Sequence, residues 1–207
     1  NDPSPKYAQR NSKLYNERRA QLISYIDKFD TLPELLGEKG YLSHQSGKWW
    51  EGNFKRGGFT HGMSRGFPQP GGRHGDDGLK IGRNGMEPIE DFVDHAIAKK
   101  KPFFLYVSHK AVHADFVAAD RHLGRYKDRQ LPLPPTFADT KANYRNKPRW
   151  LKDQRNSRHG VDFAYNLPDF DLNNYYIRYC ETLLAVDESL GRILKKLEER
   201  NELKDTL

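Results

Sequence analysis

The chain has 207 residues, and its 35 Lys and Arg against 28 Asp and Glu give a net charge of +7. Hydrophobic residues make up 36% and charged residues 30%, which is polar for a globular protein but excludes a disordered composition. The length is that of one domain. The positive charge favours an anionic ligand, such as nucleic acid, a lipid head group, or a sulfated or phosphorylated compound, without choosing among them.

Few features of the chain indicate where the protein works. The single cysteine, Cys180, excludes an internal disulfide and leaves the redox compartment open. No run approaches the ~20 apolar residues that a membrane-spanning helix needs, and no signal peptide precedes the first residues. Because the chain starts at Asn1 and stops at Leu207 without a cap or tail, we expect it to be a piece cut from a longer protein.

Two helices are predicted before the first strand. The first spans 16–27, and its apolar face carries Leu22, Ile23 and Ile26. Thr31 and Glu34 form a capping-box pattern, which predicts the start of a second, short helix. Gly40 is placed to end this helix, because glycine adopts the left-handed backbone conformation without steric cost.

Two strands and a third helix follow. Residues 41–46 are predicted to form a strand, and the glycine-rich stretch 51–86 is predicted to be a long loop without regular structure. A helix then begins at Pro88, and its core-facing residues are Ile89, Phe92, Val93, Ala96 and Ile97. The continuous apolar run 103–107 predicts a strand buried on both faces.

The last third of the chain combines an excursion with a long helix. Residues 117–172 are rich in Pro, Asn, Asp and Arg, which predicts an extended surface segment, and 174–201 form the long helix. Its apolar stripe is predicted to comprise Tyr176, Cys180, Leu183, Leu184, Leu190, Ile193, Leu194 and Leu197. Alternating helices and buried strands indicate an α/β layered domain.

Two residues of the long helix need an explanation. Asp187 falls on the predicted buried stripe, where an unpaired carboxylate is costly, so we expect it to bond a backbone N–H or a basic side chain. Cys180 lies in the same stripe and is predicted to be a core thiol rather than a nucleophile.

Charged and titratable side chains follow both predicted strands. Lys48 comes directly after Gly47 at the end of the first strand, and His109 and His113 follow the second. Ligands of α/β sheets gather beyond the carboxyl ends of the strands. The lysine and a histidine therefore suggest an anion site, with fixed charge from Lys48 and a proton donor for a leaving group. The competing interpretation is that Lys48 is a surface residue stacked on a tryptophan.

A metal site within the chain is not predicted. The His109 and His113 spacing fits a His-x-x-x-His pair, but that motif relies on a helix to align the rings. Here the spacing straddles the end of a strand and no third ligand is obvious.

Four ordered stretches resemble the sulfatase family of the alkaline-phosphatase-like superfamily: LPELLGEKGYLSHQSGKWW at 32–50, KPFFLYVSHKAVHADF at 101–116, YYIRYCETLLAVDESLGRILKKLEE at 175–199 and DTL at 205–207. They are similar to the family's helix and G-K-W-H segment, its buried strand and P-H-x-P segment, its long Asp and Gly-Arg helix, and the strand before its Asp-Asn-Gly metal motif. The Asn1-Asp2-Pro3 start is similar to the segment after the family's nucleophile helix. Agreement in order and spacing is weak only in 60–86 and 119–172.

The resemblance implies a fold and roles for named residues. The expected fold is a three-layer α/β/α sandwich, alkaline-phosphatase-like and incomplete, with 1–207 an internal part of a single catalytic domain. Lys48 matches the family lysine that contacts the sulfate and the nucleophile, and His113 matches the histidine that binds sulfate or protonates the leaving alcohol. His109 lies close by without a family role, and Trp50 replaces the second histidine of G-K-W-H. We also expect substrate contacts from Trp50 and Arg83.

The resemblance implies a sulfuric ester hydrolase acting on a sulfated carbohydrate or an aryl sulfate. The formylglycine nucleophile and the calcium ligands of the family are expected outside this chain, because no C/S-x-P-x-R motif occurs in it. Family members of this kind are exported, and no nucleic-acid partner is expected. A phosphate-transferring relative, a nucleic-acid-binding module that stacks bases on Trp49 and Trp50, and a pseudo-enzyme that binds sulfated glycans remain alternatives.

Overall fold

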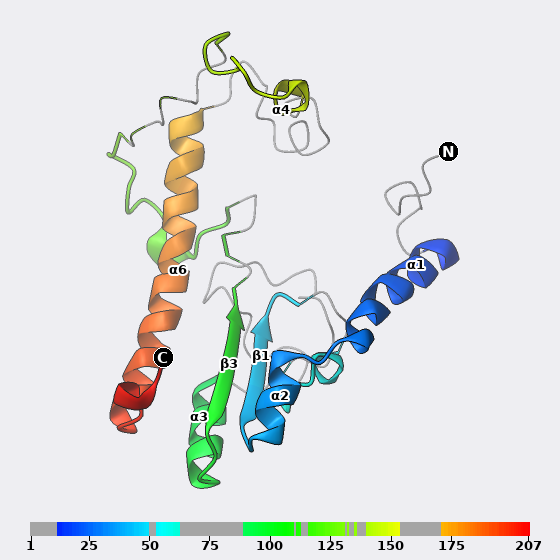
Figure 1. Cartoon of the computed structure of the whole chain (residues 1–207). Helices are drawn as coiled ribbons and strands as arrows, with labels where there is room; N and C mark the ends of the chain where they lie inside the picture. The colour runs from blue at the N-terminus through cyan, green and yellow to red at the C-terminus, as the bar shows by residue number, and fades with distance from the viewer. Residues whose placement is uncertain are drawn as a thin grey trace.

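The computed structural model describes residues 12–49, 53–62, 89–109, 111–112, 116–130, 132, 135, 140–153 and 171–207. At its centre lies a parallel sheet with strand order β2-β1-β3, made of β1 (Leu42–Gly47), β2 (His61–Gly62) and β3 (Phe103–Ser108) (Figure 1). The register between β1 and β3 runs from Leu42 opposite Phe103 to Gly47 opposite Ser108. Both predicted strands are confirmed, and they end at the same edge of the sheet.

The short strand β2 was not predicted. Hydroxyl groups hold it beside β1: the Ser43 N–H donates to Thr60 Oγ1 at 2.8 Å, and the Thr60 N–H donates to Ser43 Oγ at 3.1 Å. A 3₁₀ helix, η3 (Phe54–Gly57), precedes it. The prediction that 51–86 holds no regular element is therefore wrong for 54–62, while 63–86 lies outside the described residues.

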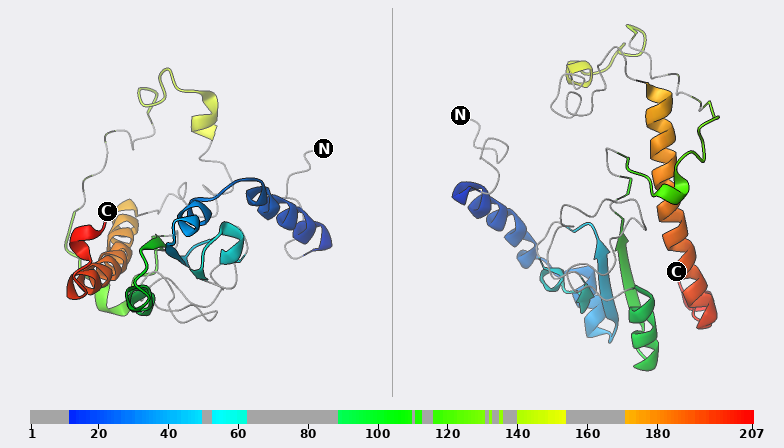
Figure 2. Two further views of the ribbon diagram at one scale, coloured as in Figure 1. Left: turned by 60° about the horizontal axis from the view of Figure 1, so that its bottom comes forward. Right: turned by 180° about the vertical axis from the view of Figure 1, so that it is seen from behind.

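Helices α2 (Leu32–Glu38) and α3 (Ile89–Ala98) lie on opposite sides of the sheet, as the left view of Figure 2 shows. The predicted capping box of α2 is confirmed, since the Thr31 N–H donates to Glu34 Oε2 at 2.8 Å and Thr31 Oγ1 accepts from the Glu34 N–H at 3.4 Å. Gly40 adopts the left-handed conformation, with φ of +85°. The described residues thus form an α/β/α arrangement.

The predicted core face of α3 is confirmed. Its residues Ile89, Phe92, Val93 and Ala96 are buried, and half-buried Ile97 packs against the core. The Phe92 ring lies 4.9 Å from the His44 ring of β1 and 5.0 Å from the His61 ring of β2, centroid to centroid. This packing fixes α3 against two strands at once.

The first helix is confirmed but its apolar face is not covered by described residues. It runs as α1 (Lys13–Ile23) and continues as the 3₁₀ helix η2 (Ser24–Lys28), and neither contains a buried residue. Leu22 is 62% exposed. Figure 1 shows α1 extending away from the sheet.

The long helix α6 (Leu172–Glu199) is confirmed, but it buries a different face from the predicted one. The buried residues are Ile177, Glu181, Thr182, Ala185, Ser189, Ile193 and Leu197. Of the predicted stripe, Leu183, Leu190 and Leu194 are 42%, 45% and 51% exposed. The difference arises because the contact with α3 is made only near the C-terminal end of α6, by Ile193 and Leu197.

An ion-pair network also joins α3 to α6. The Lys196 ammonium donates to Asp94 Oδ2 at 2.5 Å and Arg200 Nε donates to Asp94 Oδ1 at 2.7 Å. The hydrogen bonds from Arg200 and Lys196 lower the pKa of the Asp94 carboxyl below its ordinary value. Both carboxylate oxygens are therefore occupied by α6.

The remaining elements complete the description. Strand β3 is half-buried and its Tyr106 is 38% exposed, so the prediction of burial on both faces is wrong for the described chain. The excursion carries the short helices η4 (Asp120–His122) and α4 (Arg149–Asp153), and η7 (Leu203–Asp205) follows α6. Within the described ranges, no helix has the length and apolar character to cross a bilayer.

Candidate functional site

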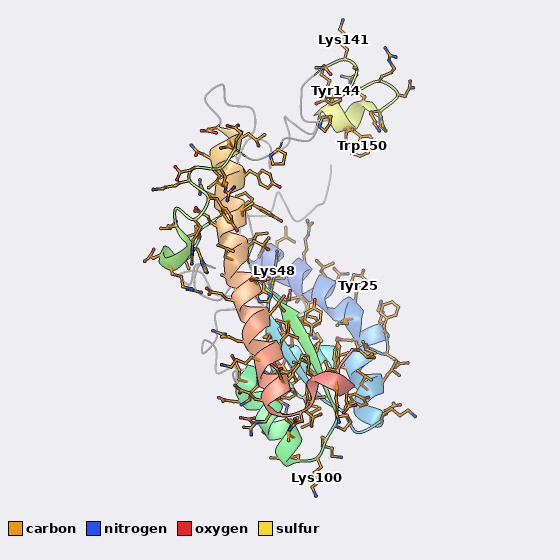
Figure 3. The ribbon with its side chains drawn as sticks, turned by 90° about the vertical axis from the view of Figure 1, so that its left-hand side faces the viewer. Tyr25, Lys48, Lys100, Lys141, Tyr144 and Trp150 are labelled. Carbon is orange, nitrogen blue, oxygen red and sulfur yellow. The ribbon has the colours of Figure 1, made fainter. Side chains whose placement is uncertain are left out.

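The candidate site lies at the edge of the sheet where β1 and β3 finish. Beyond the last strand residues, the Lys48 N–H donates to the Ser108 carbonyl at 2.6 Å, so the pairing of the two segments continues for one more residue. Lys48 and His109 are consequently neighbours at the carboxyl edge, where α/β sheets bind their ligands. Figure 3 shows Lys48 at this end of the sheet and Lys100 at the opposite end.

Local backbone geometry explains how Lys48 leaves the strand. Gly47 has φ of +85°, a left-handed conformation that a residue with a Cβ adopts only with strain. The chain therefore turns at Gly47 and places Lys48 half-buried beyond β1. A half-buried ammonium group interacts more strongly with an anion than an exposed one, because less water screens the charge.

The structure describes only two of the predicted site residues. Lys48 and His109 are both half-buried at the same edge, as the strand-end argument predicted. His113, Trp50 and Arg83 lie outside the described residues, so their roles stay predictions.

An aromatic cluster that the sequence reasoning missed supports the lysine segment. The Trp49 ring meets Phe59 edge-on at 5.5 Å and Tyr106 edge-on at 5.8 Å, measured between ring centroids. A Cβ added at Gly57 would stand 2.7 Å from Trp49 Cζ2. Trp49 is therefore part of the packing that holds the residue after Lys48, rather than a free platform for stacking a base. The Gly57-Gly58 pair five residues into the loop was the available signal, since glycine in such a place allows close approach.

The acids of α6 differ from the prediction. Asp187 is exposed, so the expectation that it is buried with a partner is wrong. The buried acid is Glu181, which is 3% exposed and accepts from the Tyr126 N–H at 3.3 Å. The acid in the strong ion pair is Glu188, whose Oε2 accepts from Arg121 Nη2 at 2.6 Å.

The environment of these acids agrees with their partners. The hydrogen bond from Arg121 lowers the pKa of Glu188, and the charge of His122 acts in the same direction. Cys180 is half-buried rather than fully buried. Burial raises the pKa of its thiol and the Glu181 charge adds to the effect, which keeps the thiol protonated at neutral pH and disfavours a nucleophilic role.

Calcium was expected only outside this chain. In the described part of the sequence, no three His, Cys, Asp or Glu side chains come together as a metal site. The residues that the structure describes therefore do not offer a ligand set into which calcium fits.

The family model named Sulfatase matches residues 6–207 of the chain. The chain belongs to the sulfatase family. This finding confirms the resemblance that the ordered motifs indicated, and it assigns Lys48 and His109 to the catalytic fold of a sulfatase.

Several known proteins are similar to this sulfatase chain. An N-acetylglucosamine-6-O-sulfatase of Bacteroides thetaiotaomicron is 26% identical over 237 residues, which covers 86% of this chain and 42% of the relative. The multifunctional alkaline phosphatase superfamily protein PehA of Trinickia caryophylli is 26% identical over 113 residues, 52% of this chain and 22% of PehA. Sulfatase ppz1 of Metarhizium majus is 29% identical over 125 residues, 55% of this chain and 26% of ppz1.

A solved structure is also similar. It is described as a complex with its substrate D-glucosamine-2-N,6-O-disulfate, and the superposition has a TM-score of 0.49 with 24% sequence identity. The match covers 83% of this chain and 47% of the other. The chain thus spans less than half the length of these relatives.

Proposed function

We propose that the full-length gene product hydrolyses sulfate esters, and that its substrate is a sulfated carbohydrate. The observation that carries the proposal is the position of Lys48, half-buried beside His109 at the carboxyl edge of the sheet of a sulfatase-family chain. The carbohydrate class is supported by the relative named N-acetylglucosamine-6-O-sulfatase, which matches most of this chain.

The residues of this chain have distinct roles in the proposed reaction. Lys48 holds the negatively charged sulfate by its ammonium group, and His113 donates a proton to the oxygen of the leaving alcohol. Overall, the bond between sulfur and the ester oxygen breaks, a water oxygen ends on sulfur, and the alcohol leaves with a proton. Trp50 and Arg83 contact the substrate, while His109 borders the site.

The cofactors of the proposed reaction follow from the family resemblance. We propose that calcium and a formylglycine nucleophile are held by residues outside 1–207; when bound, they supply charge screening and the attacking oxygen. Export of the protein is proposed on the same ground. Neither group is needed to define what Lys48 and His113 do.

The test compares substrates and variants of the full-length gene product. We expect release of sulfate from 4-nitrophenyl sulfate and from glucosamine 6-sulfate at rates well above those of phosphate release from 4-nitrophenyl phosphate. The variant Lys48→Ala should lose about 100-fold or more in kcat/KM, as removal of one preorganised charge-stabilising donor typically does. Lys99→Ala is the matched control, since Lys99 is exposed at the end of α3 away from the site, and it should retain the activity.

Two results would contradict the proposal. Faster phosphate than sulfate release would favour a phosphate-transferring relative, an alternative that the similarity to PehA makes worth testing. Absence of turnover together with salt-sensitive binding of mixed oligonucleotides would favour the nucleic-acid-binding alternative.

A further inference from the structure

The segment that follows β3 returns to α6 and is anchored there by aromatic contacts. The Phe116 ring lies 4.7 Å from the Tyr175 ring and 5.4 Å from the Tyr179 ring, both edge-on. Phe116 has φ of +37°, a left-handed conformation that is costly for a bulky residue and persists only where the surroundings impose it. The contacts with the two tyrosines are such surroundings.

Farther along the segment, two carboxylates of α6 bind it. Buried Glu181 accepts from the Tyr126 N–H. Glu188 Oε2 accepts from both Nε and Nη2 of Arg121, at 2.8 and 2.6 Å. Its other oxygen, Oε1, lies 3.3 Å from Nε2 of His122, whose side chain is only 4% exposed. One glutamate thus engages two consecutive residues of η4.

These contacts bracket the part of the chain that carries the candidate histidines. One end of the segment is fixed in the sheet, where Ser108 pairs with Gly47. The other end is fixed at η4 by Glu188. His109 and His113 both lie between these two points in the sequence. A change in how η4 sits on α6 therefore changes one of the two boundary conditions of the histidine segment.

We propose that Glu188 is a positioning residue of the sulfatase site, which through Arg121 and His122 sets the placement of the segment containing His113. The inference rests on the proposed function for His113 as proton donor. The Arg121 and Glu188 side chains are 45% and 46% exposed. Exposed ion pairs contribute little to global stability, whereas a displacement of about 1 Å at a reacting group can cost on the order of 100-fold in rate.

The distinguishing readout is the dependence on the leaving group. An alkyl alcohol such as the sugar 6-hydroxyl leaves only when protonated, whereas 4-nitrophenol leaves as a stable anion and needs little help from an acid. Misplacing the proton donor should therefore slow hydrolysis of glucosamine 6-sulfate more than that of 4-nitrophenyl sulfate. A purely structural role would slow both substrates equally, through the loss of folded protein.

The experiment uses Glu188→Gln in the full-length gene product, with Glu198→Gln as the control on an exposed acid of the same helix. We expect kcat/KM for glucosamine 6-sulfate to fall about tenfold more than for 4-nitrophenyl sulfate, with Tm lowered by no more than about 4 °C. The charge-swapped double variant Arg121→Glu with Glu188→Arg should recover most of the loss. An equal loss on both substrates, or no loss, would overturn the inference.

A separate measurement distinguishes this inference from the proposed function. If the wild-type protein hydrolyses neither ester, the proposed function fails, and hydrogen exchange of residues 109–122 then decides on the positioning role. Faster exchange in Glu188→Gln than in Glu198→Gln supports it, and unchanged exchange overturns it.

Discussion

Truncation of Phe92 is the sharpest test of how α3 is placed against the sheet. The Phe92 side chain is fully buried, and its ring is in contact with the rings of His44, His61 and Phe103. Phe to Ala changes in protein cores cost about 3–5 kcal/mol, through lost transfer free energy and the cavity left behind. Because three rings would border the cavity and edge-on aromatic pairs add to the burial term, we expect about 4 kcal/mol for Phe92→Ala.

A free energy of that size is readily measured. It corresponds to a change of nearly 1,000-fold in the unfolding equilibrium constant, at about 1.4 kcal/mol for each factor of ten. The assay is urea unfolding of the full-length gene product followed by circular dichroism. The matched control is Phe29→Ala, because Phe29 is 70% exposed and its truncation should change the free energy by no more than about 0.5 kcal/mol. A cost below about 1 kcal/mol for Phe92→Ala would refute the packing of α3 on β1 and β2.

Three further predictions address other parts of the structure. Gly57→Ala should displace the indole of Trp49, seen as a shift in tryptophan fluorescence, because the new Cβ would stand 2.7 Å from Trp49 Cζ2; an unchanged spectrum would contradict that contact. Asp94 has a lowered pKa because of hydrogen bonds from Arg200 and a neighbouring lysine, so its contribution to stability is present above its ordinary value of 3.8 and is lost as pH falls through the lower folded pKa. Asp94→Asn should therefore destabilise at neutral pH, and the gap to wild type in urea unfolding should narrow below pH 3.8; a gap independent of pH would argue against the ion pairs. Cys180, whose pKa is raised by burial, should react with iodoacetamide more slowly at neutral pH than free cysteine does, and fast labelling of folded protein would show that the thiol is accessible and ionised.

The aromatic cluster changes how the lysine site should be understood. Trp49 follows Lys48 directly, and its ring packs against Phe59 from the loop and Tyr106 from β3. The indole thus ties the residue after Lys48 to two separate parts of the chain. A lysine held in this way loses less conformational freedom on binding an anion, which favours a preorganised charge at this edge.

Local interactions were accessible to sequence reasoning. The Thr31 and Glu34 capping box involves atoms three residues apart, so the pattern alone predicts it, and the structure confirms it. The core face of α3 was predicted correctly because its apolar residues occupy one face only. Both long strands and their order along the chain followed from their apolar runs and flanking turns, and the meeting of Lys48 with His109 followed from the rule for parallel strand ends.

Features that depend on distant partners were not accessible. Helix α6 has apolar side chains on more than one face, so periodicity could not choose which face is buried; the position of α3 and η4 makes that choice and leaves Leu190 exposed. Glu181 is buried because the Tyr126 N–H, far away in the sequence, supplies its hydrogen bond. The sequence alone therefore determined the elements, their order and the family to which the chain belongs. Only the tertiary structure decided which polar groups meet, because a buried carboxylate is tolerated where a donor from another segment arrives and nowhere else.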